Sequence, residues 1–157
     1  MQLMLLIRPI VPEDKALLVA GLRALSPETA MKRFLSPKVR FSDAELAYLT
    51  EVDGHDHIAY VAVIGGTLVA VGRVVKTAPD TADLAIVVGD PWQGHGLGGW
   101  MARLLAAAAA IEGVTRIGGT MLADNGPALR ILKGVSSDIV YDDLSHGVRE
   151  IVTRLAA

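Results

Sequence analysis

The chain has 157 residues, of which 52% are hydrophobic and 20% are charged, and its mean hydropathy is +0.42. This composition excludes a disordered chain and predicts a single globular domain over residues 1–157. The 15 basic and 17 acidic side chains give a formal net charge of −2, which argues against nucleic acid or an anionic membrane as the main partner. There are no cysteines, so disulfide frameworks and thiolate metal sites are excluded.

The N-terminal segment Met1–Ile7 predicts a first β-strand rather than a signal peptide. Its apolar run is short, no basic residue precedes it, and Arg8 and Pro9 follow directly. The longest unbroken apolar stretch, Leu104–Ile111, is far shorter than the roughly 20 residues that cross a bilayer. We therefore expect a cytoplasmic protein with no membrane partner.

Amphipathic helices are predicted for the rest of the first third. Pro12–Leu22 carries leucines at helical spacing. The run Ser26-Pro27-Glu28 offers an N-cap, a proline at the first helical position and an acid in the first turn. The run Ser42-Asp43-Ala44-Glu45 is a capping box that opens a further helix. Basic residues cluster around these helices: Lys32, Arg33, Lys38 and Arg40.

From His57 onward the pattern changes to β-strands. The segments His57–Ile64 and Thr67–Lys76 are rich in β-branched residues, and the two glycines between them predict a tight hairpin. After a turn at Thr77–Asp80, the segment Thr81–Val88 is the next expected strand. Three antiparallel strands thus precede a glycine-rich loop.

The remainder of the chain predicts helix, strand, helix and hairpin. The loop Gly89–Gly99 feeds a helix that Gly113 ends. The later elements are a strand over Val114–Leu122, a short helix that Asp124–Pro127 opens and that runs through Leu132, and a hairpin of Ile139–Asp142 and Val148–Leu155.

The glycine loop has the chemistry of an anion site. Free N–H groups in the first helical turn carry a partial positive charge, and the glycines at 94, 96 and 98 let a phosphate approach the backbone. The spacing Gly94-x-Gly96-x-x-Gly99 also satisfies the dinucleotide-binding pattern, which expects an acid about 20 residues on, but it follows a hairpin and no acid lies between Glu112 and Asp124. A phosphate-bearing cofactor is the prediction; a nicotinamide enzyme and a plain glycine turn are the alternatives.

The run Gln93-Gly94-His95-Gly96-Leu97-Gly98 resembles the Q/R-x-x-G-x-G/A motif of the GNAT superfamily of acyl-CoA N-acyltransferases. The order of predicted elements agrees with that family over nearly the whole chain. Within it, several segments resemble the Pat-type bacterial protein lysine acetyltransferases: Leu25-Ser26-Pro27-Glu28, Arg33-Phe34, Val52-Asp53, Trp92-Gln93-Gly94 and Leu122-Ala123-Asp124-Asn125. The resemblance implies an α/β (α+β) fold, with a mixed, mostly antiparallel sheet of six to seven strands that is flanked by helices and splayed between its fourth and fifth strands.

The same resemblance implies acetyl-CoA as co-substrate, with no metal. The pantetheine would pair with backbone of Ile86, Val87 and Val88, and the Val88 amide would donate to the thioester oxygen. Asn125 matches a position that contacts the pantetheine arm. The pyrophosphate would lie on the amides of Gln93, Gly94, His95, Gly96, Leu97 and Gly98, and Gly99 is a further expected cofactor-binding residue.

An amine acceptor must lose a proton before it attacks, which for lysine costs about 4.6 kcal/mol at pH 7. A positioned carboxylate can accept that proton directly or through one water. In the Pat-like pattern the base is a glutamate ten residues before the motif's glutamine, and Asp83 occupies that position here. Aspartate is one methylene shorter, which favours a water relay. An acid on a solvated strand face is the alternative role for Asp83.

One departure from the family concerns the general acid. Many members carry a tyrosine seven residues after the asparagine, and Leu132 stands there. Ser136 and Ser137 are weak substitutes, and the segment 134–137 departs from the family's usual Leu-Gly-Phe. His55 and His57 invite a metal interpretation, although polarity of the loop before a strand accounts for them as well.

The leading hypothesis is therefore an acetyl-CoA-dependent N-acetyltransferase that acts by direct transfer from a ternary complex. The acceptor is a primary amine, either a protein lysine, which the subfamily resemblance favours, or a small-molecule amine. A non-catalytic acyl-CoA-binding module is the competing class. We expect a monomer or homodimer with no nucleic-acid partner.

Overall fold

The computed structural model describes residues 4–156 and places seven strands in one sheet, in the order β1-β2-β3-β4-β5-β7-β6. All neighbouring strands are antiparallel except β4 and β5, which are parallel. The expected α/β class with a mostly antiparallel sheet is confirmed. The elements are β1 (Leu5–Pro9), the 3-10 turn η1 (Pro12–Asp14), α1 (Lys15–Ala24), α2 (Pro27–Phe34), α3 (Asp43–Thr50), β2 (His57–Ile64), β3 (Thr67–Ala78), β4 (Thr81–Val88), the 3-10 turn η2 (Asp90–Trp92), α4 (Leu97–Ile111), β5 (Arg116–Leu122), α5 (Gly126–Val135), β6 (Ile139–Ser145) and β7 (Val148–Arg154).

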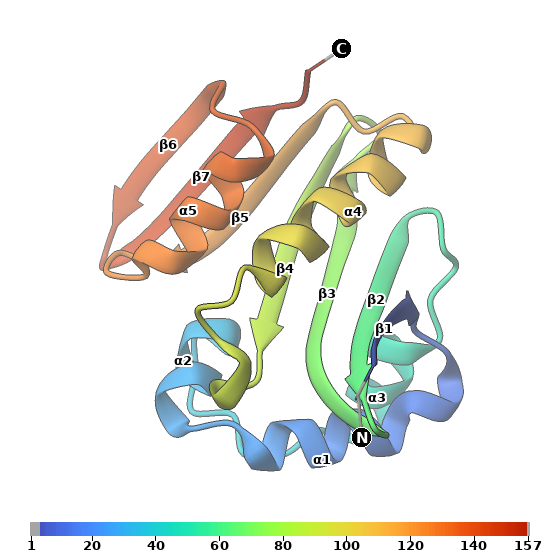
Figure 1. Cartoon of the computed structure of the whole chain (residues 1–157). Coiled ribbons are helices and arrows are strands. Elements are labelled where there is room, and N and C mark those ends of the chain that lie inside the picture. The colour runs from blue at the N-terminus through green and yellow to red at the C-terminus, as the bar shows by residue number, and fades with distance from the viewer. Residues whose placement is uncertain (1–3, 157) are drawn as a thin grey trace.

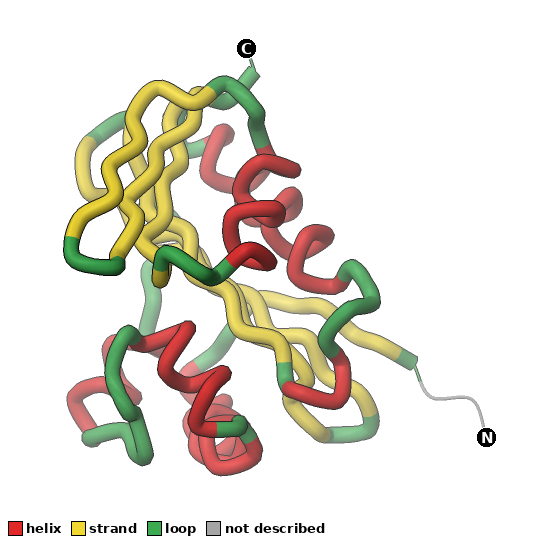
Figure 2. Tube along the Cα trace, turned by 90° about the vertical axis from the view of Figure 1, so that its left-hand side faces the viewer, coloured by secondary structure: helices red, strands yellow, loops and turns green. Residues whose placement is uncertain are grey.

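Helices cover the two faces of the sheet in separate groups (Figures 1 and 2). On one face α4 and α5 lie across the strands, and Leu105 of α4 packs with Ile58 in the larger hydrophobic core. On the other face Leu18 of α1 and Leu46 of α3 pack with Ala59. Because successive strand residues point to opposite faces, the neighbours Ile58 and Ala59 serve the two cores in turn.

Local signals account for the helix starts. The Ser26 hydroxyl accepts from the Thr29 N–H at 3.1 Å and so caps α2. The Ser42 hydroxyl accepts from the Glu45 N–H at 3.1 Å, while a Glu45 carboxylate oxygen accepts from the Ser42 N–H at 3.0 Å. The predicted cap and the predicted capping box are both confirmed.

The predicted hairpin turn between β2 and β3 is also confirmed. Gly65 and Gly66 have φ of 55° and 80°, the left-handed values that a two-residue hairpin turn requires. His146 and Gly147, with φ of 53° and 77°, make the corresponding turn between β6 and β7. Since this turn takes only two residues, β6 continues to Ser145, beyond the predicted end at position 142.

Other boundaries shift by a few residues. The first strand is Leu5–Pro9, and residues 1–3 of the predicted strand lie outside the described residues. The strand predicted from Val114 begins at Arg116, because the N–H groups of Thr115 and Arg116 both donate to the Asp80 carbonyl. The helix predicted through Leu132 continues to Val135. Within residues 4–156, no helix is both long and apolar enough to cross a membrane.

Candidate functional site

The sheet splays open between β4 and β5. The two strands pair only at their starts, where Thr81–Asp83 lies beside Arg116–Gly118. Beyond this point they diverge, with α4 and α5 on one side (Figure 1). The opening holds a cleft of about 660 Å³, bordered by β4, the glycine loop, α4, β5 and α5. The predicted splay between the fourth and fifth strands is therefore confirmed.

The cleft gathers almost all the residues that were predicted to bind acetyl-CoA. His95 alone among them does not border it; its neighbours on both sides do. The residues at the cleft are Ile86, Val87, Val88, Gln93, Gly94, Gly96, Leu97, Gly98, Gly99 and Asn125. Their position fits the predicted role, and their contacts with the cofactor stay a prediction.

The glycine loop presents bare backbone to this cleft. Gly94 and Gly96 have φ of 81° and 82°, and a Cβ built at either position would meet nothing within 4 Å. The loop ends at the N-terminus of α4, where the Trp100 N–H donates to the Gly96 carbonyl and the preceding amides remain available. The open approach and the positive end of the helix fit a pyrophosphate.

Strand β4 presents free backbone groups along the opening. The Gly89 N–H donates to the Val69 carbonyl of β3 at 2.8 Å. Because the direction of the amides alternates along an antiparallel strand, the N–H groups of Ile86 and Val88 point away from β3 and toward the splay. The Val88 carbonyl accepts from the Gln93 side-chain amide at 2.9 Å, on that same open edge. A pantetheine amide could pair with the free groups of β4 here.

Asp83 lies at the closed end of the splay, opposite Val75 of β3 and beside Gly118 of β5. It does not border the cleft, and its side chain reaches solvent. The neighbouring strands still desolvate the carboxylate in part, and this burial raises the pKa of Asp83, with a smaller contribution from the negative charge of Glu150. The shift is in the direction that a general base for an amine requires.

Asn125 has a structural role that the sequence analysis did not predict. Its side-chain oxygen accepts from the Ala128 N–H at 3.2 Å and caps α5. The residue is buried at the edge of the cleft. The cap satisfies the oxygen, so the side-chain NH₂ is the group left to contact a bound molecule.

The two weaker site hypotheses find little support in the geometry. Nδ1 of His55 pairs with Glu112 at 3.0 Å, whereas Nε2 of His57 accepts from the buried Arg73. The two imidazoles thus have separate partners, and residues 4–156 contain no group of three or more potential ligands that could hold a metal. Leu132 is buried in the core, and the Ser136 hydroxyl donates to the Arg154 carbonyl.

The cleft also contains residues that the motif did not reveal. From α2 come Thr29, Lys32 and Arg33, and from α4 and α5 come Arg103 and Arg130. The sequence had flagged the basic cluster around the early helices but not its position. The packing of α2 against β4 brings two residues of that cluster, Lys32 and Arg33, to the cleft, whereas Lys38 and Arg40 do not border it.

Comparisons with known proteins agree with this geometry. Residues 26–133 match the acetyltransferase (GNAT) family. The chain belongs to that family. It is 32% identical over 149 residues to acetyltransferase Pat from Mycolicibacterium smegmatis, a match that covers 92% of this chain but 44% of that protein. The expected resemblance to a Pat-type GNAT domain is confirmed.

Solved structures show the same fold. The GNAT domain of S. lividans Pat superposes with a TM-score of 0.84 at 27% identity, covering 95% of this chain and 89% of that one. The putative acetyltransferase yncA from Salmonella typhimurium, solved with acetyl-CoA, superposes with a TM-score of 0.77 at 14% identity, covering 97% and 94%. The second likeness concerns the fold alone.

Proposed function

We propose that this GNAT domain transfers the acetyl group of acetyl-CoA to a primary amine, the side chain of a protein lysine. The observation that carries the proposal is the cleft between β4 and β5, in which free strand backbone and an unobstructed glycine loop lie in series. That order suits a molecule with a pantetheine arm followed by a pyrophosphate. Arg103 and Arg130 add positive charge at the cleft, which suits the phosphate that CoA carries in addition to its pyrophosphate.

The proposed transfer needs a donor to the thioester oxygen and a base for the amine, and Val88 and Asp83 would serve these two roles. The amine nitrogen would form a bond to the carbonyl carbon of the thioester as the carbon–sulfur bond breaks, and sulfur would leave as the thiolate. The Val88 N–H would donate to the carbonyl oxygen, where negative charge develops. Asp83 would receive the amine proton, with a water between them because its side chain does not border the cleft.

The lysine acceptor is supported by the similarity to Pat, of which the chain covers less than half. A small-molecule amine is the alternative acceptor. The burial of Leu132, where a general acid often stands in the family, favours a second candidate function, a non-catalytic acyl-CoA-binding module. A cytoplasmic location, independence of metals and a monomeric or homodimeric state stay predictions.

The test is calorimetric titration with acetyl-CoA, followed by measurement of thiol release with lysine-bearing proteins and small amines. Micromolar binding with turnover is expected. Binding without turnover on a broad panel would replace the transferase by the binding module. Failure to bind acetyl-CoA would refute both.

A further inference from the structure

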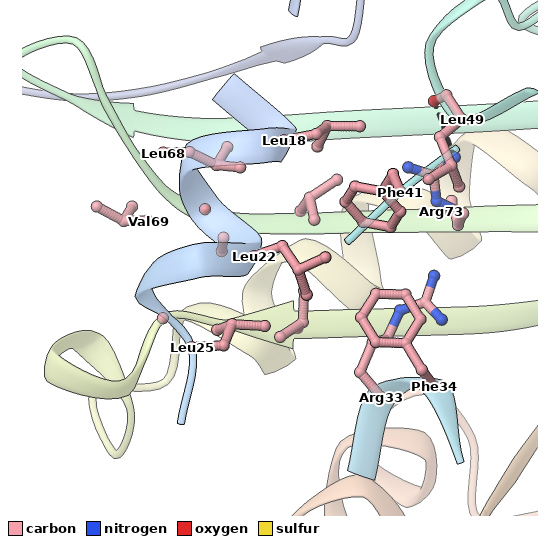
Figure 3. A pocket seen from close by; sticks show the side chains of 15 residues that line it. Leu18, Leu22, Leu25, Arg33, Phe34, Phe41, Leu49, Leu68, Val69 and Arg73 are labelled. Carbon is pink, nitrogen blue, oxygen red and sulfur yellow. Dashed lines mark hydrogen bonds between the residues drawn. The ribbon is translucent and has the colours of Figure 1, made fainter. Parts of the chain in front are cut away.

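A second, smaller pocket lies between α1, α2 and the sheet (Figure 3). Its volume of about 50 Å³ is room for a few water-sized atoms. Most of the wall is apolar, yet two guanidinium groups border it, from Arg33 of α2 and Arg73 of β3. The apolar wall includes Leu18, Leu22, Phe34, Phe41 and Leu49.

Arg73 is buried, with 4% of its surface exposed. Its Nη1 donates to the Leu49 carbonyl at 3.0 Å and to Nε2 of His57 at 2.8 Å. Burial, and then the nearby charge of Arg33, lower the pKa of Arg73 to about 10, so the guanidinium remains charged at neutral pH. Burial, and then Arg73, lower the pKa of His57 to about 4, so this imidazole is neutral at pH 7 and adds no charge beside Arg73.

Arg33 is partly exposed and has fewer polar partners within the protein than Arg73. Its guanidinium lies 4.8 Å from the centre of the Phe34 ring, and it forms no ion pair or hydrogen bond with another residue of the described range 4–156. Burial lowers its pKa. Figure 3 shows the Arg33 side chain extending from α2 toward β3, where the Arg73 guanidinium lies against Leu49 and near enough for the charge of Arg33 to act on it. Two like charges converge there, and an anion between them would relieve their repulsion.

The pocket lies beside the proposed reaction site. Arg73 is opposite Ala85 in the β3–β4 register, and Asp83 is opposite Val75. Cross-strand partners share a face, so Arg73 and Asp83 are diagonal neighbours on one face, roughly 7–8 Å apart at Cα. Arg33 borders both the pocket and the cleft. A molecule whose amine lies near Asp83 could therefore extend toward the two arginines.

We propose that the Arg33–Arg73 pocket is a subsite for a carboxylate on a short hydrocarbon stem, and that the acceptor protein carries this carboxylate on an acidic side chain close to the lysine. A guanidinium presents paired N–H donors that match the two oxygens of a carboxylate, and the leucine and phenylalanine walls suit the stem. The acceptor assignment rests on the acetyl transfer proposed above, whereas carboxylate binding as such does not.

The first experiment uses butyrate as the probe and its neutral amide, butyramide, as the comparison, at matched ionic strength. Arg33→Gln removes the guanidinium, and Arg33→Lys keeps the positive charge but lacks the paired N–H donors that match a carboxylate. Arg40→Gln is the control, since Arg40 is exposed and borders neither cavity. We expect calorimetry to show butyrate binding to the wild type and to Arg40→Gln, at least tenfold weaker binding to Arg33→Gln and an intermediate loss in Arg33→Lys. Equal binding of butyrate and butyramide, or undiminished butyrate binding by Arg33→Gln, would overturn the subsite.

The second experiment finds the source of the carboxylate. ω-Amino acids of graded length and their amides are compared in the thiol-release assay. For at least one chain length, we expect the ω-amino acid to have a higher kcat/KM than its amide. We expect this preference to vanish in Arg33→Gln, and we expect butyrate to compete with the amine substrate. If butyrate changed the turnover of amines that lack a carboxylate but did not compete with them, the pocket would bind an effector that is separate from the substrate. That result would overturn the acceptor assignment. Turnover of no amine at all would overturn that assignment together with the transferase, while the butyrate titration still decides the subsite.

Discussion

The carboxylate of Asp90 accepts a hydrogen bond from the backbone N–H of Ser26, 64 residues earlier in the chain, at 3.1 Å. Its second oxygen accepts from the Thr29 hydroxyl at 3.0 Å. The Gln93 side-chain amide donates both to Thr29, at 3.3 Å, and to the Val88 carbonyl. The start of α2 is thus fastened to the glycine loop and to β4. Helix α2 and the glycine loop are therefore held as one unit.

Removing this link gives the first prediction. In Asp90→Ala the Ser26 N–H and the Thr29 hydroxyl lose their acceptor, and we expect the free energy of unfolding to fall by about 1–2 kcal/mol. We also expect weaker acetyl-CoA binding, because the glycine loop loses its hydrogen bonds to the start of α2. Urea denaturation and calorimetric titration measure the two effects. Asp143→Ala is the control, because it removes an exposed carboxylate that has no side-chain hydrogen bond among the described residues. If Asp90→Ala were as stable as this control, the prediction would be contradicted.

The glycine loop gives the second prediction. Gly96→Ala forces an L-residue into the left-handed region, at φ of 82°, and places a methyl group where a phosphate would approach. Gly54→Ala is a matched control, because Gly54 has φ of 77° and equally open surroundings but does not border the cleft. We expect both variants to lose about 1–2 kcal/mol of stability. Only Gly96→Ala should raise the Kd for acetyl-CoA, by about tenfold or 1.4 kcal/mol; equal Kd values for the two variants would contradict this.

The parts of the fold that could be predicted are those that local sequence determines. Ser26 and Ser42 signal helix starts through bonds to backbone three residues on, and the glycines at 65 and 66 signal a turn by their freedom at positive φ. These interactions need no distant partner. The glycine loop was visible for the same reason, since a strand, three glycines and a helix follow one another directly in the chain.

The residues that could not be predicted depend on contacts between distant segments. Arg33 reaches the cleft because α2 packs beside β4, and Arg73 is buried because α1 and α3 pack on its face of the sheet, where it donates to the Leu49 carbonyl. Arg33 belonged to a basic cluster on a predicted amphipathic helix, which usually indicates a solvated face, and Arg73 stood in a predicted strand with no signal of its own. The exclusion of Asp83 from the cleft depends likewise on where β4 and β5 begin to diverge.

A third prediction concerns stability at the N-terminal side of the sheet. Asp14 is buried and accepts two hydrogen bonds from the Arg8 guanidinium, each at 2.8 Å. The bonds from Arg8 lower the pKa of Asp14 against the opposing effect of burial. A lowered folded-state pKa contributes stability that is present above the unfolded value of 3.8 and is lost as the pH falls through the folded value.

We therefore expect Asp14→Asn to cost about 2 kcal/mol at pH 7, less than for a fully buried pair because Arg8 is partly exposed. The difference in unfolding free energy between the two proteins should shrink below about pH 4. Urea denaturation at several pH values measures it. A difference that is the same at pH 7 and at pH 3 would show that the ion pair is not its source.

The last prediction addresses the proposed base. Burial and the charge of Glu150 raise the pKa of Asp83, and a base must be deprotonated to act, so kcat should fall as the pH drops through that raised value. Asp83→Asn should lower kcat about 100-fold and abolish this acidic limb, whereas Glu13→Gln, at an exposed carboxylate on η1, should change neither. Glu150→Gln removes the neighbouring negative charge, so the pKa of Asp83 should fall and the limb should move to lower pH with little loss of maximal kcat. Thiol-release rates across the pH range distinguish these outcomes. If Asp83→Asn retained the wild-type profile, the carboxylate would be no more than an acid on a solvated strand face, and the proton of the amine would leave by another route.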